Sequence, residues 1–130
     1  NIHAAALNVK IKAYPSKLKR RSEIGMMYNE GFKDLPLEMP IQQKDQIYQE
    51  YIIRIQDMYR FKKYMDRKKI ELLIRDTTPN HIMYRWYFGD VSLPVTEAHA
   101  KNSVRLPTYP ELRQDEVKEI IKAVRQYYGR

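Results

Sequence analysis

Cysteine is absent from the 130 residues of this chain. The absence excludes a disulfide-stapled scaffold and any metal site built from thiolates, and it is typical of a cytoplasmic protein. We therefore expect a cytoplasmic location.

Glycine and histidine are scarce, with four glycines and three histidines. No GxGxxG or P-loop pattern surrounds the glycines, which excludes a glycine-rich phosphate loop. No serine lies in a GxSxG turn. No two histidines have the HxxxH or HExxH spacing of a zinc site, so we predict no metal site.

Long apolar runs are also missing, and no stretch of about 18 apolar residues could cross a membrane. The first residues lack the basic and apolar regions of a signal peptide. The length of 130 residues fits a single domain, residues 1–130.

Basic residues are in excess, with 24 Lys and Arg against 16 Asp and Glu, for a formal charge of +8. They form two clusters, Lys10 to Arg21 and Arg60 to Lys69. Such a surplus suits polyanionic partners, and one alternative is a stand-alone basic nucleic-acid-binding module. We favour solvated helix faces, because both clusters lie in helical patterns.

Aromatic residues gather at Met83 to Phe88, where an arginine lies among them. Such a mixture could stack nucleic-acid bases. No recognised nucleic-acid-binding motif accompanies it, so we do not expect nucleic acid as a partner. We interpret these aromatics as a surface that contacts another domain or subunit.

Helical spacing of apolar residues begins at Ile2 and predicts a helix up to Pro15. Proline should restart the helix there, with Ser16 as its cap, and the pattern then continues to Asp34. The last helix is predicted from Asp115 onward, with a continuous apolar stripe and acidic residues in its first turn.

Between these helices, residues 49–55 alternate in the manner of a strand, and shorter strands are predicted at residues 70–75 and 104–106. Asp57 should cap a helix after the first strand, and Thr96 a short helix before the third. Residues 76–95 read as irregular. The pattern predicts an α+β fold with a small three- or four-stranded, mostly antiparallel sheet and helices packed on one face.

Residues 93–112, which read LPVTEAHAKNSVRLPTYPEL, resemble the carboxy-terminal signature of the DegT/StrS family of sugar aminotransferases. That family typically reads LPVTE, a short helix and a strand ending in LPxYPxL. Arg20-Arg21 and Tyr28-Asn29 are similar to the family's RR and YN, and residues 47–54 resemble its VYHLYVIR strand.

The resemblance implies the small domain of a fold-type I, pyridoxal-phosphate-dependent enzyme. Such a homodimer moves an amino group from glutamate to a nucleotide-linked keto sugar, in the biosynthesis of polysaccharides or deoxyaminosugars. In the family, the cofactor lysine and phosphate cup lie on the large domain, upstream of this segment. We therefore expect no catalytic or cofactor-binding residue in this chain and no activity on its own. The alternative within this family is a structural dimerisation module.

Two departures from the family pattern stand out. Lys69 replaces the usual glycine before Ile70, and residues 77–84 only loosely match the HYPxPLH segment that lines the sugar-nucleotide side of the family's cleft. His81 and Arg85 are the substrate-binding candidates here, because histidine can hydrogen-bond a sugar or phosphate and arginine can bind a diphosphate bidentately. The alternative is that both are exposed loop residues.

Overall fold

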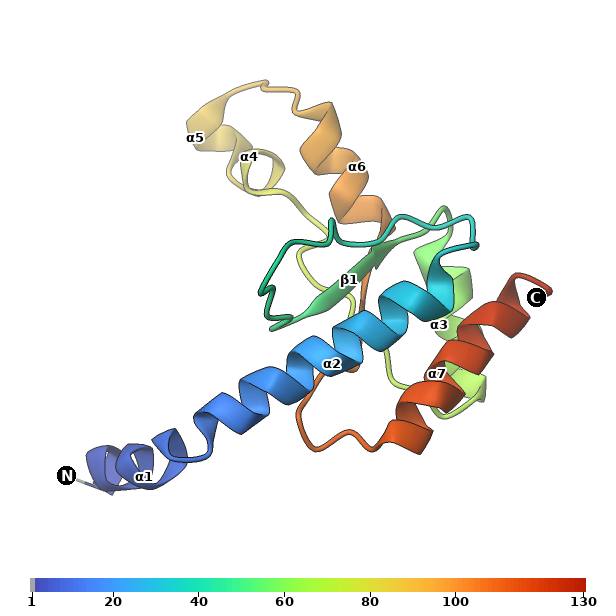
Figure 1. Ribbon diagram of the computed structural model, residues 1–130. Helices are drawn as coiled ribbons and strands as arrows, with labels where there is room; N and C mark the ends of the chain where they lie inside the picture. The colour runs from blue at the N-terminus through green and yellow to red at the C-terminus, as the bar shows by residue number, and fades with distance from the viewer. Residues whose placement is uncertain (1) are drawn as a thin grey trace.

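The computed structural model describes residues 2–130. Two consecutive helices, α1 (Ile2–Ile11) and α2 (Tyr14–Phe32), come first, with α1 turned at an angle to α2 (Figure 1). The predicted break before Pro15 is confirmed, since proline lies in the first turn of α2. Ser16 as the cap is wrong. Its Oγ donates to the carbonyl oxygen of Ala13 at 2.8 Å, and Ala13 holds the cap position.

The sheet consists of two antiparallel strands, β1 (Tyr51–Arg54) and β2 (Ser103–Leu106), with Tyr51 opposite Leu106. Each edge carries one isolated bridge, Glu38 with Arg54 on one side and Leu73 with Arg105 on the other. The α+β class and the antiparallel pairing are confirmed. The sheet is narrower than the predicted three or four full strands.

The strand predicted at residues 70–75 is wrong except at Leu73, which exchanges two hydrogen bonds with Arg105. The next donor in one direction would be Pro107, which has no N–H. In the other direction the N–H of Ser103 is already donated to the carbonyl of His99, at the end of a helix. The ladder therefore stops after one pair.

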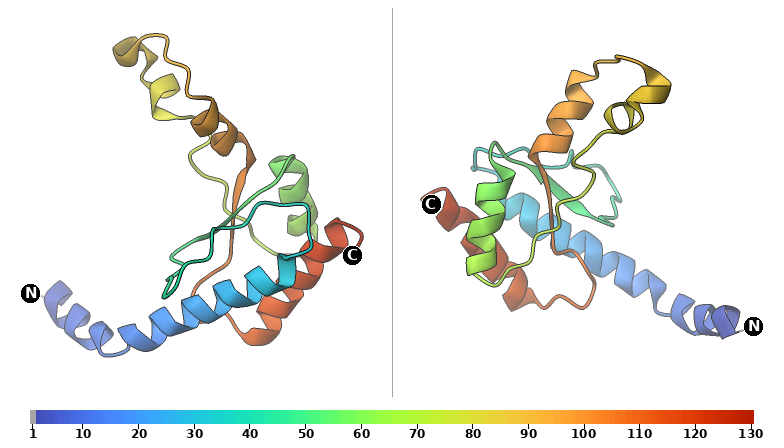
Figure 2. Two further views of the ribbon diagram at one scale, coloured as in Figure 1. Left: turned by 45° about the horizontal axis from the view of Figure 1, so that its top comes forward. Right: turned by 180° about the vertical axis from the view of Figure 1, so that it is seen from behind.

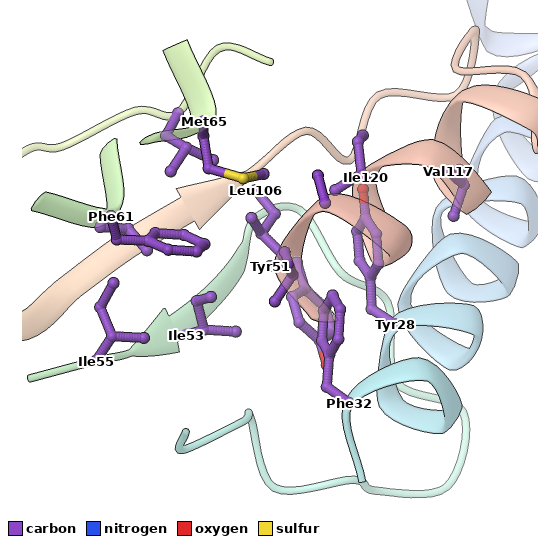
Figure 3. Packing of buried hydrophobic residues seen from close by; sticks show 14 of the residues in the cluster. Tyr28, Phe32, Tyr51, Ile53, Ile55, Phe61, Met65, Leu106, Val117 and Ile120 are labelled. Atoms are coloured by element: carbon purple, nitrogen blue, oxygen red, sulfur yellow. The ribbon is translucent and has the colours of Figure 1, made fainter. Parts of the chain in front are cut away.

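The core lies between one face of this sheet and three helices, α2, α3 (Met58–Arg67) and α7 (Gln114–Tyr127) (Figure 3). Alternation directs Tyr51 and Ile53 of β1 to this face. The side chain of Asp57 accepts from the N–H of Arg60 at 3.0 Å, so the predicted cap of α3 is confirmed. The predicted last helix is also confirmed, with buried residues Val117, Ile120, Ala123 and Val124.

Two of the family-like motifs fasten α2 to the segment after β2. Arg20 donates to the carbonyl of Leu112 at 2.8 Å, and Arg21 donates to that of Thr108 at 3.0 Å. The hydroxyl of Tyr28 donates to the carbonyl of Pro107 at 2.7 Å. These side chains donate hydrogen bonds to backbone carbonyls of a proline-containing segment that cannot extend the strand ladder. Their role is therefore structural.

Two parts of the chain project from this body in different directions (Figure 2). One is α1, which has no buried residue although it is rich in apolar side chains. The other is a segment of residues 76–102, which we call the arm. It contains α4 (Asn80–Met83), α5 (Arg85–Phe88) and α6 (Pro94–Asn102). No helix in residues 2–130 is long and apolar enough to span a membrane.

Candidate functional site

The arm leaves the sheet at its edge and returns to it at β2 (Figure 1). Pro79 precedes α4, and Gly89 ends α5 with a φ of 72°, which favours glycine. The sequence predicted an irregular segment at 76–95 because each of these helices is one turn long. The predicted cap Thr96 is wrong, since α6 begins at Pro94 and its cap position is Leu93.

The tip of the arm exposes a group of aromatic side chains. Trp86 is 82% exposed and Tyr87 73%, and Tyr84 and Phe88 are about half exposed. The ring of Tyr87 meets those of Trp86 and Phe88 edge-on, with centroids 5.9 and 5.1 Å apart. Contiguous exposed apolar groups of this kind commonly mark interaction sites, so the contact surface stays a prediction that this exposure supports.

His81, a predicted substrate ligand, lies on α4 within the arm and is only 7% exposed. Its Nε2 lies 3.2 Å from Oε1 of Glu97 on α6. The same oxygen accepts the N–H of Leu93 at 2.9 Å. Hydrogen bonds from Leu93 and then from His81 lower the pKa of Glu97 below its ordinary value. His81 is therefore not the exposed loop residue of the alternative interpretation.

Arg85, the other predicted ligand, is exposed at the tip and pairs with Asp90. The structure does not bring Arg85 and His81 onto a common partner, because each engages a different carboxylate.

A polar hollow of about 650 Å³ lies between the arm and the outer face of the sheet. Its lining is rich in hydroxyl, amide and guanidinium groups, and includes Arg75, Thr77, Thr78, Asn80, Ser103 and Arg105. Neither His81 nor Arg85 lines it.

Arg105 is the central charge of this hollow and was missed by the sequence reasoning. Its Nε donates to Glu50 at 2.7 Å and its Nη2 to Asp76 at 2.9 Å, while Nη1 is buried with no hydrogen-bond partner in the described chain. Nη1 of Arg75 donates to Oε1 of Glu50 at 3.4 Å, so the two arginines share this carboxylate. Strand alternation could have placed Arg105 on the outer face, but its carboxylate partners are 55 and 29 residues away in sequence.

A metal ion or a cofactor bound to this chain would need suitable side chains around it. No group of three His, Asp or Glu side chains in residues 2–130 could hold a metal ion. A pyridoxal-phosphate lysine needs a desolvated pocket with a carboxylate for the pyridine nitrogen. Here the lysines are exposed, apart from half-buried Lys62, which pairs with Asp66 at 2.9 Å.

Comparison with known proteins gives a consistent result. The sequence model that describes the DegT/DnrJ/EryC1/StrS aminotransferase family matches residues 1–125 of this chain. The chain is 26% identical to the dTDP-3-amino-3,6-dideoxy-alpha-D-galactopyranose transaminase of Aneurinibacillus thermoaerophilus, over 97% of this chain and 36% of that protein. It is also 26% identical to the dTDP-3-amino-3,4,6-trideoxy-alpha-D-glucose transaminase of Streptomyces venezuelae, over 99% of this chain and 36% of that protein.

Solved structures agree with these sequence matches. DesV of S. venezuelae, crystallised with a ketimine intermediate, superposes with a TM-score of 0.91 over 98% of this chain and 36% of that one, at 26% identity. A DegT/DnrJ/EryC1/StrS aminotransferase from Brucella abortus superposes with a TM-score of 0.88, over 98% of this chain and 35% of that one, at 23% identity. The chain spans about a third of the length of these relatives. Its sequence and its fold show that this chain belongs to the DegT/DnrJ/EryC1/StrS aminotransferase family.

Proposed function

We propose that this chain is the carboxy-terminal small domain of a cytoplasmic, pyridoxal-phosphate-dependent aminotransferase that moves an amino group from glutamate to a nucleotide-linked keto sugar. The observation that carries the proposal is the family match over residues 1–125, together with a span of only 36% of the transaminase relatives. The whole chain, residues 1–130, forms one domain in this proposal.

The cofactor belongs to a large domain, on the same polypeptide or another chain. Pyridoxal phosphate supplies an electron sink for amino transfer when bound there. In this proposal, this chain contributes a wall of the cleft and contacts with the large domain or a second subunit. Because the lysines of this chain are exposed, apart from half-buried Lys62, we assign the lysine that bonds the cofactor to the large domain.

Two exposed apolar surfaces support docking to that domain or to a second subunit of a homodimer. One is α1, whose Ile2 is 86% exposed. Leu7, Val9 and Ile11 add to it. The other is the aromatic tip of the arm. Burying both surfaces would remove a large apolar area from water, which is the main driving force for such association.

The arm and the polar hollow would form the wall of the cleft on the substrate side. Arg85, which pairs with Asp90 in this structure, would exchange that carboxylate for a diphosphate, which a guanidinium binds bidentately. His81 is engaged by Glu97, so we propose that it acts on substrate binding by holding the arm in place.

The first test is spectroscopic. Pyridoxal phosphate added to this chain should give no saturable aldimine absorbance, and borohydride reduction should leave no single lysine labelled stoichiometrically. One lysine labelled at a ratio of one to one would contradict the proposal.

The second test is genetic. The coding sequence upstream of Asn1, or a neighbouring gene, is expected to encode the lysine-bearing large domain. In the assembled enzyme, Arg85→Gln should raise KM for the nucleotide sugar more than it lowers kcat, while KM for glutamate stays unchanged. An unchanged KM for the nucleotide sugar would remove Arg85 from the site.

A further inference from the structure

A second binding site is indicated on the side of the molecule formed by α3 and α7, which lie side by side away from the aromatic tip (Figure 1). A hollow of about 360 Å³ lies there, lined by Arg60, Lys63, Tyr64, Arg67, Gln126 and Tyr127. Three of the six residues are cations and none carries a carboxylate. We propose that this hollow, the α3–α7 site, binds the phosphate groups of a small phosphorylated molecule.

The charges of the site are not neutralised by the protein. Arg60, Lys63 and Arg67 follow one another along one side of α3, and none of their side chains forms an ion pair within residues 2–130. On the same helix Lys62 does have a partner, Asp66, at 2.9 Å. The site therefore differs from an ordinary solvated face, where opposite charges alternate.

Placing these cations together weakens the helix. Like charges three or four residues apart on a helix repel one another. Arg60 also lies in the first turn, where the helix dipole disfavours positive charge, whereas Arg67 lies in the last turn, where the dipole favours it. An anion in the hollow would reverse both effects, because each guanidinium could then offer paired N–H groups to phosphate oxygens.

The aromatic part of the hollow is rigid. Tyr127 is held by Phe61, with ring centroids 4.9 Å apart, and by Tyr64 at 5.3 Å. Its ring also borders an adjoining hollow of about 480 Å³ that shares Arg60 with the first. The second hollow is also lined by Ile55, Gln56, Asp57 and Tyr128. It gives room for an uncharged part of the ligand that can donate a hydrogen bond to Asp57. Volumes of this size suit a small molecule.

This inference does not depend on the proposed aminotransferase function, because it uses no residue of the arm. The test titrates inorganic pyrophosphate into the 130-residue chain and follows backbone amide shifts by NMR. We expect shifts centred on residues 60–67 and 126–127, and binding that weakens as salt is raised.

The variant Arg60→Gln/Arg67→Gln should weaken binding at least about tenfold, since it removes two charged donors. The control Lys12→Gln/Lys44→Gln removes two exposed cations that lie outside α3 and α7 and should change binding less than about twofold. The Arg60→Gln/Arg67→Gln variant should melt no lower than the parent, because no internal ion pair is lost and like-charge repulsion on α3 is relieved. The control variant should melt like the parent.

Three results would overturn the proposal. They are an absence of shifts on α3, equal weakening by both double variants, and a preference for a single-stranded oligonucleotide over pyrophosphate at equal phosphate concentration. The last result would assign the site to nucleic acid instead of a small molecule.

Discussion

His81 and Glu97 connect the two halves of the arm, with Nε2 of the histidine 3.2 Å from Oε1 of the carboxylate. The same oxygen accepts the N–H of Leu93 ahead of α6. The glutamate of the LPVTE motif therefore ties α4 to the start of α6. The glutamate of this motif thus has a structural role in this chain. By joining α4 to α6 it positions the aromatic tip between them.

The first prediction concerns this tie. Glu97→Ala should loosen the arm, so that amide hydrogen exchange in residues 80–102 becomes faster by about 3–10-fold while the core is unaffected. Glu119→Ala, an exposed carboxylate on α7, is the matched control. Unchanged exchange in the arm would show that the tie is dispensable. Since the pKa of Glu97 is lowered, the tie should persist to a lower pH than the ordinary pKa of a glutamate would allow.

The second prediction concerns Lys69, whose φ of 59° is in the left-handed region. The N–H of Lys69 bonds the carbonyl of Asp66, and that of Ile70 bonds Met65, which together form a Schellman end to α3. Glycine is preferred there, so Lys69→Gly should stabilise the fold by about 0.5–1 kcal/mol. Lys69→Ala keeps the strain and should give no gain. Urea unfolding measures both, and equal effects of the two variants would contradict the argument.

The third prediction concerns the close approach of α2 to Tyr48. A Cβ added at Gly25 would lie 2.0 Å from Cδ2 of Tyr48, whose ring is buried. Gly25→Ala should therefore destabilise the fold by about 1–3 kcal/mol, measured by chemical denaturation.

The matched experiment repeats the substitution in a Tyr48→Ala background. With the ring removed, Gly25→Ala should be neutral or slightly stabilising, because alanine is the better helix former. A penalty of the same size in both backgrounds would mean that the contact with Tyr48 is not its cause.

The fourth prediction is a pH dependence of stability. Arg125 on α7 holds Asp34 after α2 through two hydrogen bonds of 2.7 and 2.9 Å. These bonds lower the pKa of Asp34 from 3.8 to about 2. A carboxyl whose pKa is lower in the folded state stabilises the fold above its unfolded pKa, and the contribution is lost as the pH falls.

The loss should occur between about pH 4 and pH 2. The melting temperature of the parent should therefore fall more steeply across this window than that of Asp34→Asn, which has no such carboxyl to protonate. Parallel curves would show that the pair does not contribute to acid sensitivity.

Local sequence signals identified most of the elements. The proline restart before α2, the cap at Asp57 and the apolar stripe of α7 were all predicted, because each depends on residues within one or two turns. The caps at Ser16 and Thr96 were wrong for a different reason. Each of those helices has a proline in its first turn and begins two residues before the predicted cap, at Tyr14 and at Pro94, so neither hydroxyl lies at a cap position.

The candidate site was harder to predict. The sequence singled out His81 and Arg85 by side-chain type alone, and their substrate roles stay proposals. The network around Arg105 was missed, because its carboxylates come from residues 50 and 76 and meet only across the folded sheet.

The sequence by itself determined the family of this protein, its class of fold and its lack of a glycine-rich phosphate loop, since these depend on residue types at short spacing. Tertiary structure alone decided that the sheet stops at two strands, that His81 is buried and that three cations of α3 share one hollow. Such features arise where segments distant in the chain compete for the same donors, carboxylates and space, and no local pattern records that competition.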